Sequence, residues 1–165
     1  VDGKTTIFDY WGVESIQDWA NRGKFDGEHL SEEQWELRNF YEKLLNVSLQ
    51  EKAIREGIMY DLVFANFGNK QFNSHKQYAY FRKHKNELVL VLVNFHDKPI
   101  DLELNIPAEA FQYLNLKEAD FYASKNLLNE TEEFPIQRLC SHTPYCIFLP
   151  AWDGKILKLE KANVI

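Results

Sequence analysis

Hydrophobic and polar positions along the chain change their spacing near residue 57. Before this point, apolar residues recur at intervals of three and four, as on one face of an α-helix. After it, short apolar runs are separated by polar and turn-forming residues, as in β-strands. The predicted fold is therefore mainly β: a helical segment of two or three helices, residues 1–57, precedes an antiparallel β-sandwich of seven to eight strands, residues 58–165.

The most clearly patterned helix begins after Ser31. Ser31 and Gln34 have the spacing of a capping box, in which each side chain bonds the backbone N–H of the other residue. An apolar stripe follows at helical intervals and comprises Leu37, Phe40, Tyr41, Leu44 and Leu45. Trp35 points away from this stripe, because each residue turns the helix by about 100°. A helix beside a sandwich buries one face, so we expect Trp35 or part of the stripe to be exposed.

Two shorter helices are predicted, a weaker one over 14–21 and one from Ser48 to Arg55 that Gly57 would end. Segment 87–95, ELVLVLVNF, is apolar on both faces and predicts a central strand covered on both sides. The other strand candidates are 58–65, 77–82, 100–106, 119–123, 145–149 and 155–159, with 133–136 as a doubtful addition. Turns are predicted at 83–86, 97–99 and 153–154.

Composition narrows the classes of function. The 165 residues carry a net charge of −6, which suits phosphate backbones poorly, so we expect no nucleic-acid partner. The longest apolar run, Leu88 to Val93, is far shorter than the roughly 20 residues of a membrane span, so no membrane partner is expected. The first residue is Val1 rather than Met, and we therefore expect a fragment of a longer protein.

Candidate catalytic and metal-ligating residues are few. The five histidines do not have the spacing of a metal site, and no CxxC pair is present, so neither a metal nor a cofactor is expected. Asp9, Asp18 and Asp26 lie among aromatic residues and could include a glycosidase-type carboxylate pair. Roles in turns and caps are favoured instead, since Asp26 and Gly27 form a turn dipeptide.

The two cysteines, Cys140 and Cys146, are predicted to stay reduced. Cys146 lies in the YCIFL strand, where a small buried thiol is the common case. Cys140 and His142 could form a thiol nucleophile with its base, but no third group is identifiable, so a core position is favoured for Cys140.

The N-terminal segment is rich in aromatic residues, namely Tyr10, Trp11, Trp19, Phe25 and Trp35. Such side chains can stack on pyranose rings through their apolar faces. They can equally form a core or an interface, and composition alone favours that interpretation.

Five sequence blocks, taken in order, resemble the C-terminal part of α-amylase-family glycoside hydrolases. They are TTIFDYWGVESIQDW, KFDG..LSEEQ..LRNFYEKLLN, AIREGIMYDL, YAYFR and ELVLVLVNF. The first two, over 5–46, resemble the loop after the last barrel strand and the last helix of the family's (β/α)₈ barrel. The remainder resembles the family's C-terminal β-sandwich, and beyond about Phe95 only the strand pattern agrees.

The resemblance implies a non-catalytic fragment of an enzyme that acts on α-glucans such as starch or maltooligosaccharides. The family's catalytic carboxylates lie on barrel strands, and none of those motifs matches a position here, so no catalytic residue is assigned and the chain alone is expected to be inactive. Trp11 and Trp19 are candidate substrate-binding residues, because they lie in the segment that resembles the loop at the barrel's active face.

The expected partners follow from the same resemblance. They are the missing catalytic barrel of the parent chain, an α-glucan, and a second copy of the chain bound through the exposed helical segment. A periplasmic or exported bacterial enzyme would fit the family, although no segment here indicates export. The alternative function is a stand-alone β-sandwich module that binds carbohydrate or another protein.

Overall fold

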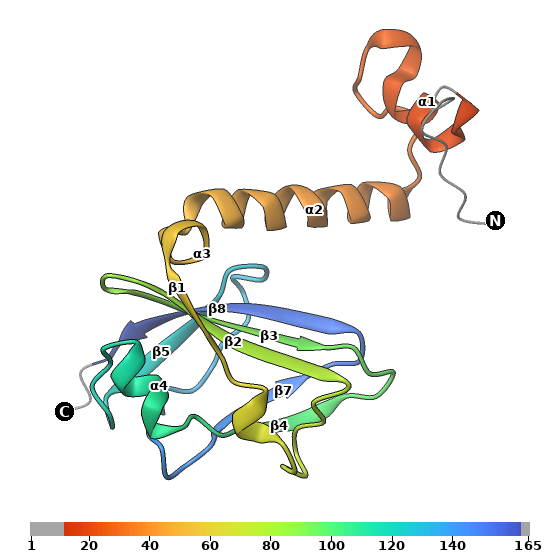
Figure 1. The fold of residues 1–165 in the computed structure, drawn as a ribbon. Coiled ribbons are helices and arrows are strands. Elements are labelled where there is room, and N and C mark those ends of the chain that lie inside the picture. Colours follow the sequence, from red (N-terminus) through yellow and green to blue (C-terminus); the bar gives the residue numbers. More distant parts are fainter. Residues whose placement is uncertain (1–11, 163–165) are drawn as a thin grey trace. The chain divides into compact units, whose positions relative to one another are not determined.

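The computed structural model describes residues 12–162, which are drawn in colour in Figure 1. The chain divides into two compact units, with the boundary between Lys43 and Leu44. The boundary between the two units therefore comes earlier in the chain than the change in residue pattern, which lies near residue 57. No helix among the described residues is long and apolar enough to cross a membrane.

The N-terminal unit contains helix α1, Glu14–Ala20, a 3₁₀ turn, Asn21–Gly23, and the first part of helix α2, Glu32–Gln50. The predicted capping box begins α2. The backbone N–H of Ser31 donates to Gln34 Oε1 at 2.8 Å, and the N–H of Gln34 donates to Ser31 Oγ at 3.2 Å. These bonds satisfy donors that a helix start leaves free, which explains why α2 begins at Glu32.

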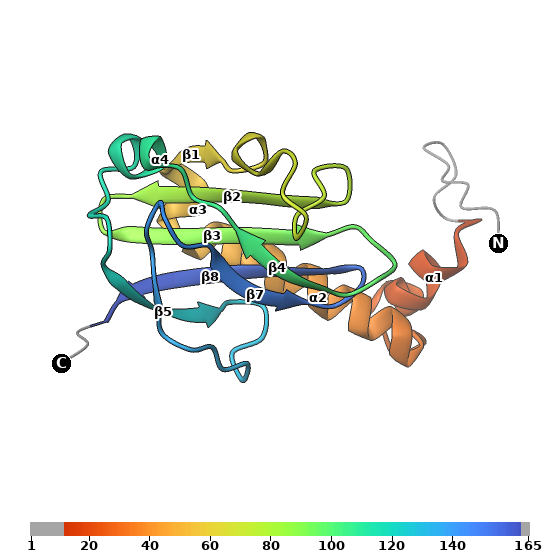
Figure 2. The ribbon, with the colours of Figure 1, turned by 90° about the horizontal axis from the view of Figure 1, so that it is seen from below.

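The second unit is built on two antiparallel sheets (Figures 1 and 2). The larger sheet has the strand order β1-β2-β3-β8-β5-β6, and the smaller one pairs β4 with β7. Their bounds are β1 Ile58–Asp61, β2 Gln77–His84, β3 Glu87–Asn94, β4 Ile100–Leu104, β5 Phe121–Asn126, β6 Gln137–Arg138, β7 Tyr145–Leu149 and β8 Asp153–Lys161. The predicted fold class, an antiparallel sandwich preceded by helices, is confirmed.

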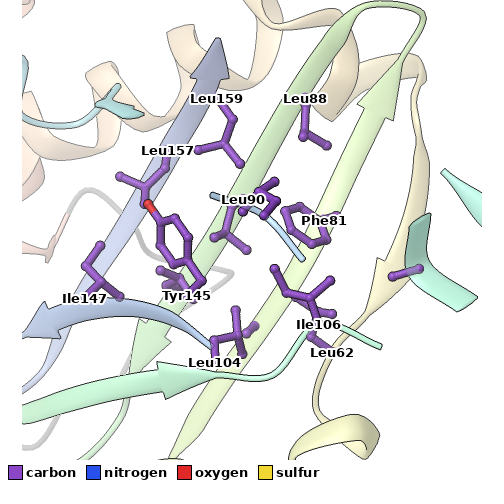
Figure 3. Close-up of a cluster of buried hydrophobic side chains, with 14 of the residues drawn as sticks. Leu62, Phe81, Leu88, Leu90, Leu104, Ile106, Tyr145, Ile147, Leu157 and Leu159 are labelled. Atoms are coloured by element: carbon purple, nitrogen blue, oxygen red, sulfur yellow. The ribbon is translucent and has the colours of Figure 1, made fainter. Parts of the chain in front are cut away.

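Strand β3 is central, as its two-sided apolar pattern predicted. It lies between β2 and β8, and its side chains alternate between two buried clusters. Leu88, Leu90 and Leu92 face the core between the sheets. In Figure 3, Leu90 lies in this core with Tyr145 and Leu104 of the smaller sheet. The opposite face of β3 presents Val89 and Val91 to the second cluster.

Residues 44–57 belong to the sheet unit because they cover this second face. Val47 of α2 and Ala53 of helix α3, Lys52–Glu56, join the second cluster. Polar contacts fix the same segment: Glu87 Oε1 accepts the Ala53 N–H at 2.7 Å, and Arg82 Nη2 donates to the Ile54 carbonyl at 2.6 Å.

Several predicted elements differ in the structure. Strand β1 ends at Asp61 rather than at residue 65, because Asp61 Oδ1 accepts the Val63 N–H at 2.7 Å and a 3₁₀ turn, Phe64–Asn66, follows. Residues 133–136 form no strand. Asp153 and Gly154 begin β8, and the turn before it is formed by Ala151 and Trp152.

One helix was not predicted. Helix α4, Ala108–Tyr113, follows Pro107 and buries Ala110 and Phe111 in the core between the sheets. It is only six residues long, so its apolar residues cannot show a helical period.

Candidate functional site

The N-terminal unit is held together by two tryptophans and an arginine. The rings of Trp19 on α1 and Trp35 on α2 meet edge to face, with centroids 6.1 Å apart and planes at 75°. The guanidinium carbon of Arg38 lies 4.4 Å from the Trp19 ring centroid and 5.3 Å from that of Trp35. A cation over an indole face is attracted by the ring quadrupole, so Arg38 stabilises both rings in this arrangement.

The Asp26–Gly27 turn closes the same cluster. Gly27 has φ +69, and a Cβ on it would lie 2.8 Å from a Trp35 ring atom and 2.9 Å from a Trp19 ring atom. Asp26 Oδ1 accepts a hydrogen bond from Asn21 Nδ2 at 2.9 Å and one from the Glu28 N–H at 3.2 Å. The bond from Asn21 lowers the pKa of the Asp26 carboxyl. The predicted turn role of Asp26 is confirmed, and Asp9 lies outside the described residues.

A mostly apolar hollow of about 580 Å³ opens beside the two indoles, and we call it the tryptophan hollow. It is lined by Ser15, Trp19, Leu30, Gln34, Leu37, Arg38 and Tyr41. Leu37 and Tyr41 are exposed, whereas Trp19 is half-buried. No carboxylate is among these lining residues, so the hollow could hold a ligand but lacks the acid pair of a glycosidase.

The two predicted substrate-binding residues have different outcomes. Trp19 lines the tryptophan hollow, but Arg38 lies over its ring, so a sugar would reach only the part of the indole that Arg38 leaves free. Trp11 lies outside the described residues. Sugar binding by this pair stays a prediction. The close approach of Arg38 and Gly27 to the two indoles was not predicted. The contact between Arg38 and Trp35 was predictable, because Arg38 stands three positions after Trp35 and hence on the same helix face.

Both cysteines are free thiols, as predicted. Cys140 is buried, its Sγ lies 2.8 Å from Thr143 Oγ1, and this hydrogen bond lowers the pKa of the thiol. The prediction that Cys146 is buried is wrong. Along β7 the side chains of Tyr145 and Ile147 face the core, and the alternation of a strand therefore turns Cys146 outward. Among residues 12–162, no group of three or more His, Cys, Asp and Glu side chains is arranged to hold a metal ion.

Solved structures that share the fold are enzymes of the α-amylase family. AmyP, solved in complex with maltose, aligns with a TM-score of 0.56 and 17% identity, over 82% of this chain and 23% of its own. An α-amylase from Geobacillus thermoleovorans, solved with acarbose, aligns with a TM-score of 0.55 and 12% identity, over 85% of this chain and 27% of its own. An Anoxybacillus α-amylase gives a TM-score of 0.53 and 14% identity, over 86% and 26%.

No protein-family model matches the chain, and a comparison with curated proteins finds no match. The chain spans about a quarter of the length of the three solved enzymes, which is the extent expected of one part of such a protein. The resemblance to α-amylase-family enzymes is therefore confirmed at the level of the fold, and over a part of those enzymes.

Proposed function

We propose that the chain is the C-terminal, non-catalytic part of an α-amylase-type enzyme that acts on α-glucans such as starch or maltooligosaccharides. The observation that carries the proposal is the uneven coverage of the structural matches. AmyP aligns over 82% of this chain but only 23% of its own, and the Geobacillus enzyme over 85% and 27%. The order of the sequence blocks over 5–95 supports the same assignment.

In this proposal, the β-sandwich supports the catalytic barrel rather than reacting with sugar. The apolar stripe of α2 is the proposed contact with the barrel. Leu37, Phe40, Tyr41 and Leu45 are 59, 49, 55 and 61% exposed, as expected from the sequence, and only Leu44 packs partly against the second cluster. A row of exposed apolar side chains is typical of an interaction surface. A second copy of the chain is the competing occupant of this stripe.

Two proteins test the proposed function. The first is the 165-residue chain, and the second is the longer protein that is translated from the whole reading frame containing it. The chain alone is expected to release no reducing sugar from starch or maltooligosaccharides, because no glycosidase carboxylate pair is assigned to it. The longer protein is expected to contain a (β/α)₈ barrel before Val1 and to hydrolyse or rearrange α-glucan. Sugar release by the chain alone, or a longer protein without a barrel, would contradict the proposal.

We also propose that the tryptophan hollow contacts glucan weakly through Trp19. An exposed stacking contact contributes only a few kcal/mol, so titration of the chain with maltoheptaose, followed by tryptophan fluorescence, should give a dissociation constant of roughly millimolar size. Trp19→Ala should weaken this binding, with Trp152→Ala as the control because Trp152 lies in the other unit and is 70% exposed. A micromolar constant that survives Trp19→Ala and Trp11→Ala would contradict this assignment.

A further inference from the structure

One end of the sandwich carries a hollow lined by lysines, which we call the lysine hollow. Its volume is about 680 Å³, and its lysines are Lys83, Lys85, Lys117, Lys158 and Lys161. They come from the end of β2 and the turn that follows it, the α4–β5 connection and the last part of β8, which lie at the same end of the sandwich in both ribbon views (Figures 1 and 2).

Leucine side chains also line the lysine hollow. Leu88 of β3 and Leu159 of β8 are directly paired across the sheet and lie side by side at one end of the core (Figure 3). Leu116 of the α4–β5 connection is a further lining residue. The hollow thus combines charged groups with apolar surface, as ligand pockets commonly do.

Two of the five lysines are neutralised by partners. Lys158 Nζ lies 2.7 Å from Glu51 Oε2, and Lys161 Nζ lies 2.5 Å from Asp120 Oδ2. By contrast, Lys85 and Lys117 are exposed and form no ion pair within the described part of the chain.

The remaining charged groups leave a positive excess. Lys83 Nζ donates to the backbone carbonyl of Lys85 and forms no ion pair among residues 12–162. Two carboxylates also line the hollow: Glu87, whose Oε1 accepts the Ala53 N–H at 2.7 Å, and Glu160, which is exposed. Glu118, next to Lys117 in sequence, is bonded to the Ser141 N–H at 2.8 Å. A local excess of positive charge on a protein of net charge −6 favours an anionic ligand.

A buried tyrosine without a hydrogen-bond partner lines the same hollow. Tyr122 of β5 is 2% exposed, and its hydroxyl is the one buried side-chain polar atom in the described residues that has no partner. Buried hydroxyls are nearly always bonded, because an unpaired one loses its hydration without compensation. Because Tyr122 lines the hollow, a small side-chain movement would let a ligand oxygen reach this buried hydroxyl and supply the missing acceptor.

We propose that the lysine hollow binds the phosphate group of a small phosphate monoester. Lys83, Lys85 and Lys117 bind the phosphate oxygens, the Tyr122 hydroxyl donates to a phosphate oxygen, and the organic part lies on the leucines. Several cations favour a dianion over a carboxylate, which carries one charge. The volume exceeds what a phosphate ion needs and falls within the ~300–1,000 Å³ range of small-molecule pockets. The proposal goes beyond the role in α-glucan breakdown and does not depend on it.

Calorimetric titration of the whole chain with three probes tests this site. Glucose 6-phosphate is expected to bind saturably, and more weakly as salt is added, whereas glucose should show no saturable binding under the same conditions. Inorganic phosphate tests whether the natural ligand is a phosphate ester or the free ion. If inorganic phosphate binds more weakly than glucose 6-phosphate, the hollow recognises an ester, and if the two bind equally, it recognises free phosphate. Absence of saturable binding by both phosphates would overturn the proposal.

A charge-removing variant, Lys85→Asn/Lys117→Gln, tests which groups bind. Lys85 has φ 52, a conformation that asparagine adopts readily, so its replacement should not impair folding. Loss of two charge-assisted contacts should weaken glucose 6-phosphate binding by roughly a hundredfold, at about tenfold each. The control is Lys70→Gln/Lys76→Gln, which makes the same change in net charge. Both lysines are exposed and precede Gln77, the first residue of β2, whereas the hollow lies at the last residues of that strand. Equal effects of the two double variants would overturn the proposal.

Tyr122→Phe tests the hydroxyl separately from folding. Because the hydroxyl has no partner, its removal should leave the melting temperature unchanged or raised while weakening glucose 6-phosphate binding about tenfold. If binding is unchanged in this variant, the assigned role of Tyr122 is wrong. If it is unchanged in the lysine variant as well, the ligand binds elsewhere.

Discussion

Replacement of Gly57 by alanine is expected to destabilise the sheet unit by about 3 kcal/mol, the upper part of the range for overpacking a well-packed site. A Cβ at this position would lie 2.3 Å from the Ala53 carbonyl oxygen and 2.6 Å from the Lys83 carbonyl oxygen. Both obstacles are backbone atoms, so neither can turn away as a side chain could. The φ of Gly57 is −76, and the expected loss therefore comes from the lack of space and not from backbone conformation.

The surroundings of Gly57 also resist adjustment. The Ala53 carbonyl accepts hydrogen bonds from the Gly57 N–H at 3.1 Å and from Arg82 Nε at 3.1 Å. Lys83 lies on β2, where it pairs with Ile58 of β1 and Leu88 of β3. Moving either carbonyl would strain α3 or the sheet, so the close approach is fixed from both sides.

Urea denaturation of Gly57→Ala and Gly154→Ala measures this effect against a matched control. At Gly154 a Cβ would meet its nearest backbone atom, the Leu92 carbonyl oxygen, at 3.4 Å, which is ordinary contact. Gly154→Ala is expected to be neutral or stabilising by up to ~1 kcal/mol, because alanine restricts the unfolded chain. Equal midpoints for the two variants would show that the sheet unit accommodates a methyl group at residue 57.

Gly57 also shows where prediction from the sequence stopped. Its position after Arg55 correctly indicated the end of a helix. The lack of space for a side chain comes from Ala53, four positions earlier, and from Lys83, 26 positions along the chain, and nothing near residue 57 encodes the approach of Lys83. The same holds for the lysine hollow, whose residues extend from Lys83 to Lys161 and meet only through the pairing of β3, β8 and β5.

Patterns that depend on neighbouring residues were predictable. The capping box at Ser31 and the two-sided strand β3 need only the residues they contain, and both are confirmed. The exposure of Cys146 was not predictable in this way, because the YCIFL strand is apolar on both faces and its exposed face carries the large Phe148 as well as Cys146. The covering of Trp19 by Arg38 was not predictable either, because it depends on how α1 meets α2, which spacing within one helix does not specify.

The burial of Asn66 is a further feature that was not predicted from the sequence. Asn66 is fully buried, between β1 and β2 in the chain. Its Nδ2 donates to the Leu62 carbonyl at 2.8 Å and to the Asn105 carbonyl at 3.0 Å. Its Oδ1 accepts the Asn105 N–H at 2.8 Å and Asn69 Nδ2 at 3.0 Å. One side chain thus satisfies the backbone of the β1–β2 connection and of the segment that follows β4.

Asn66→Ala is expected to lower the free energy of unfolding by about 3 kcal/mol or more. The substitution leaves the Leu62 carbonyl, whose bond to Asn66 is buried, and the partly buried N–H and carbonyl of Asn105 without their present partner, and each unsatisfied buried group costs about 1–3 kcal/mol. Asn129→Ala is the control, because Asn129 is exposed and its Oδ1 accepts only the Thr131 hydroxyl at 2.8 Å and the Thr131 N–H at 3.4 Å. That loss should stay below ~1 kcal/mol, since water replaces an exposed partner. Urea midpoints that fall equally in the two variants would mean that water also reaches the Asn105 backbone, and that Asn66 does not tie the β1–β2 connection to β4.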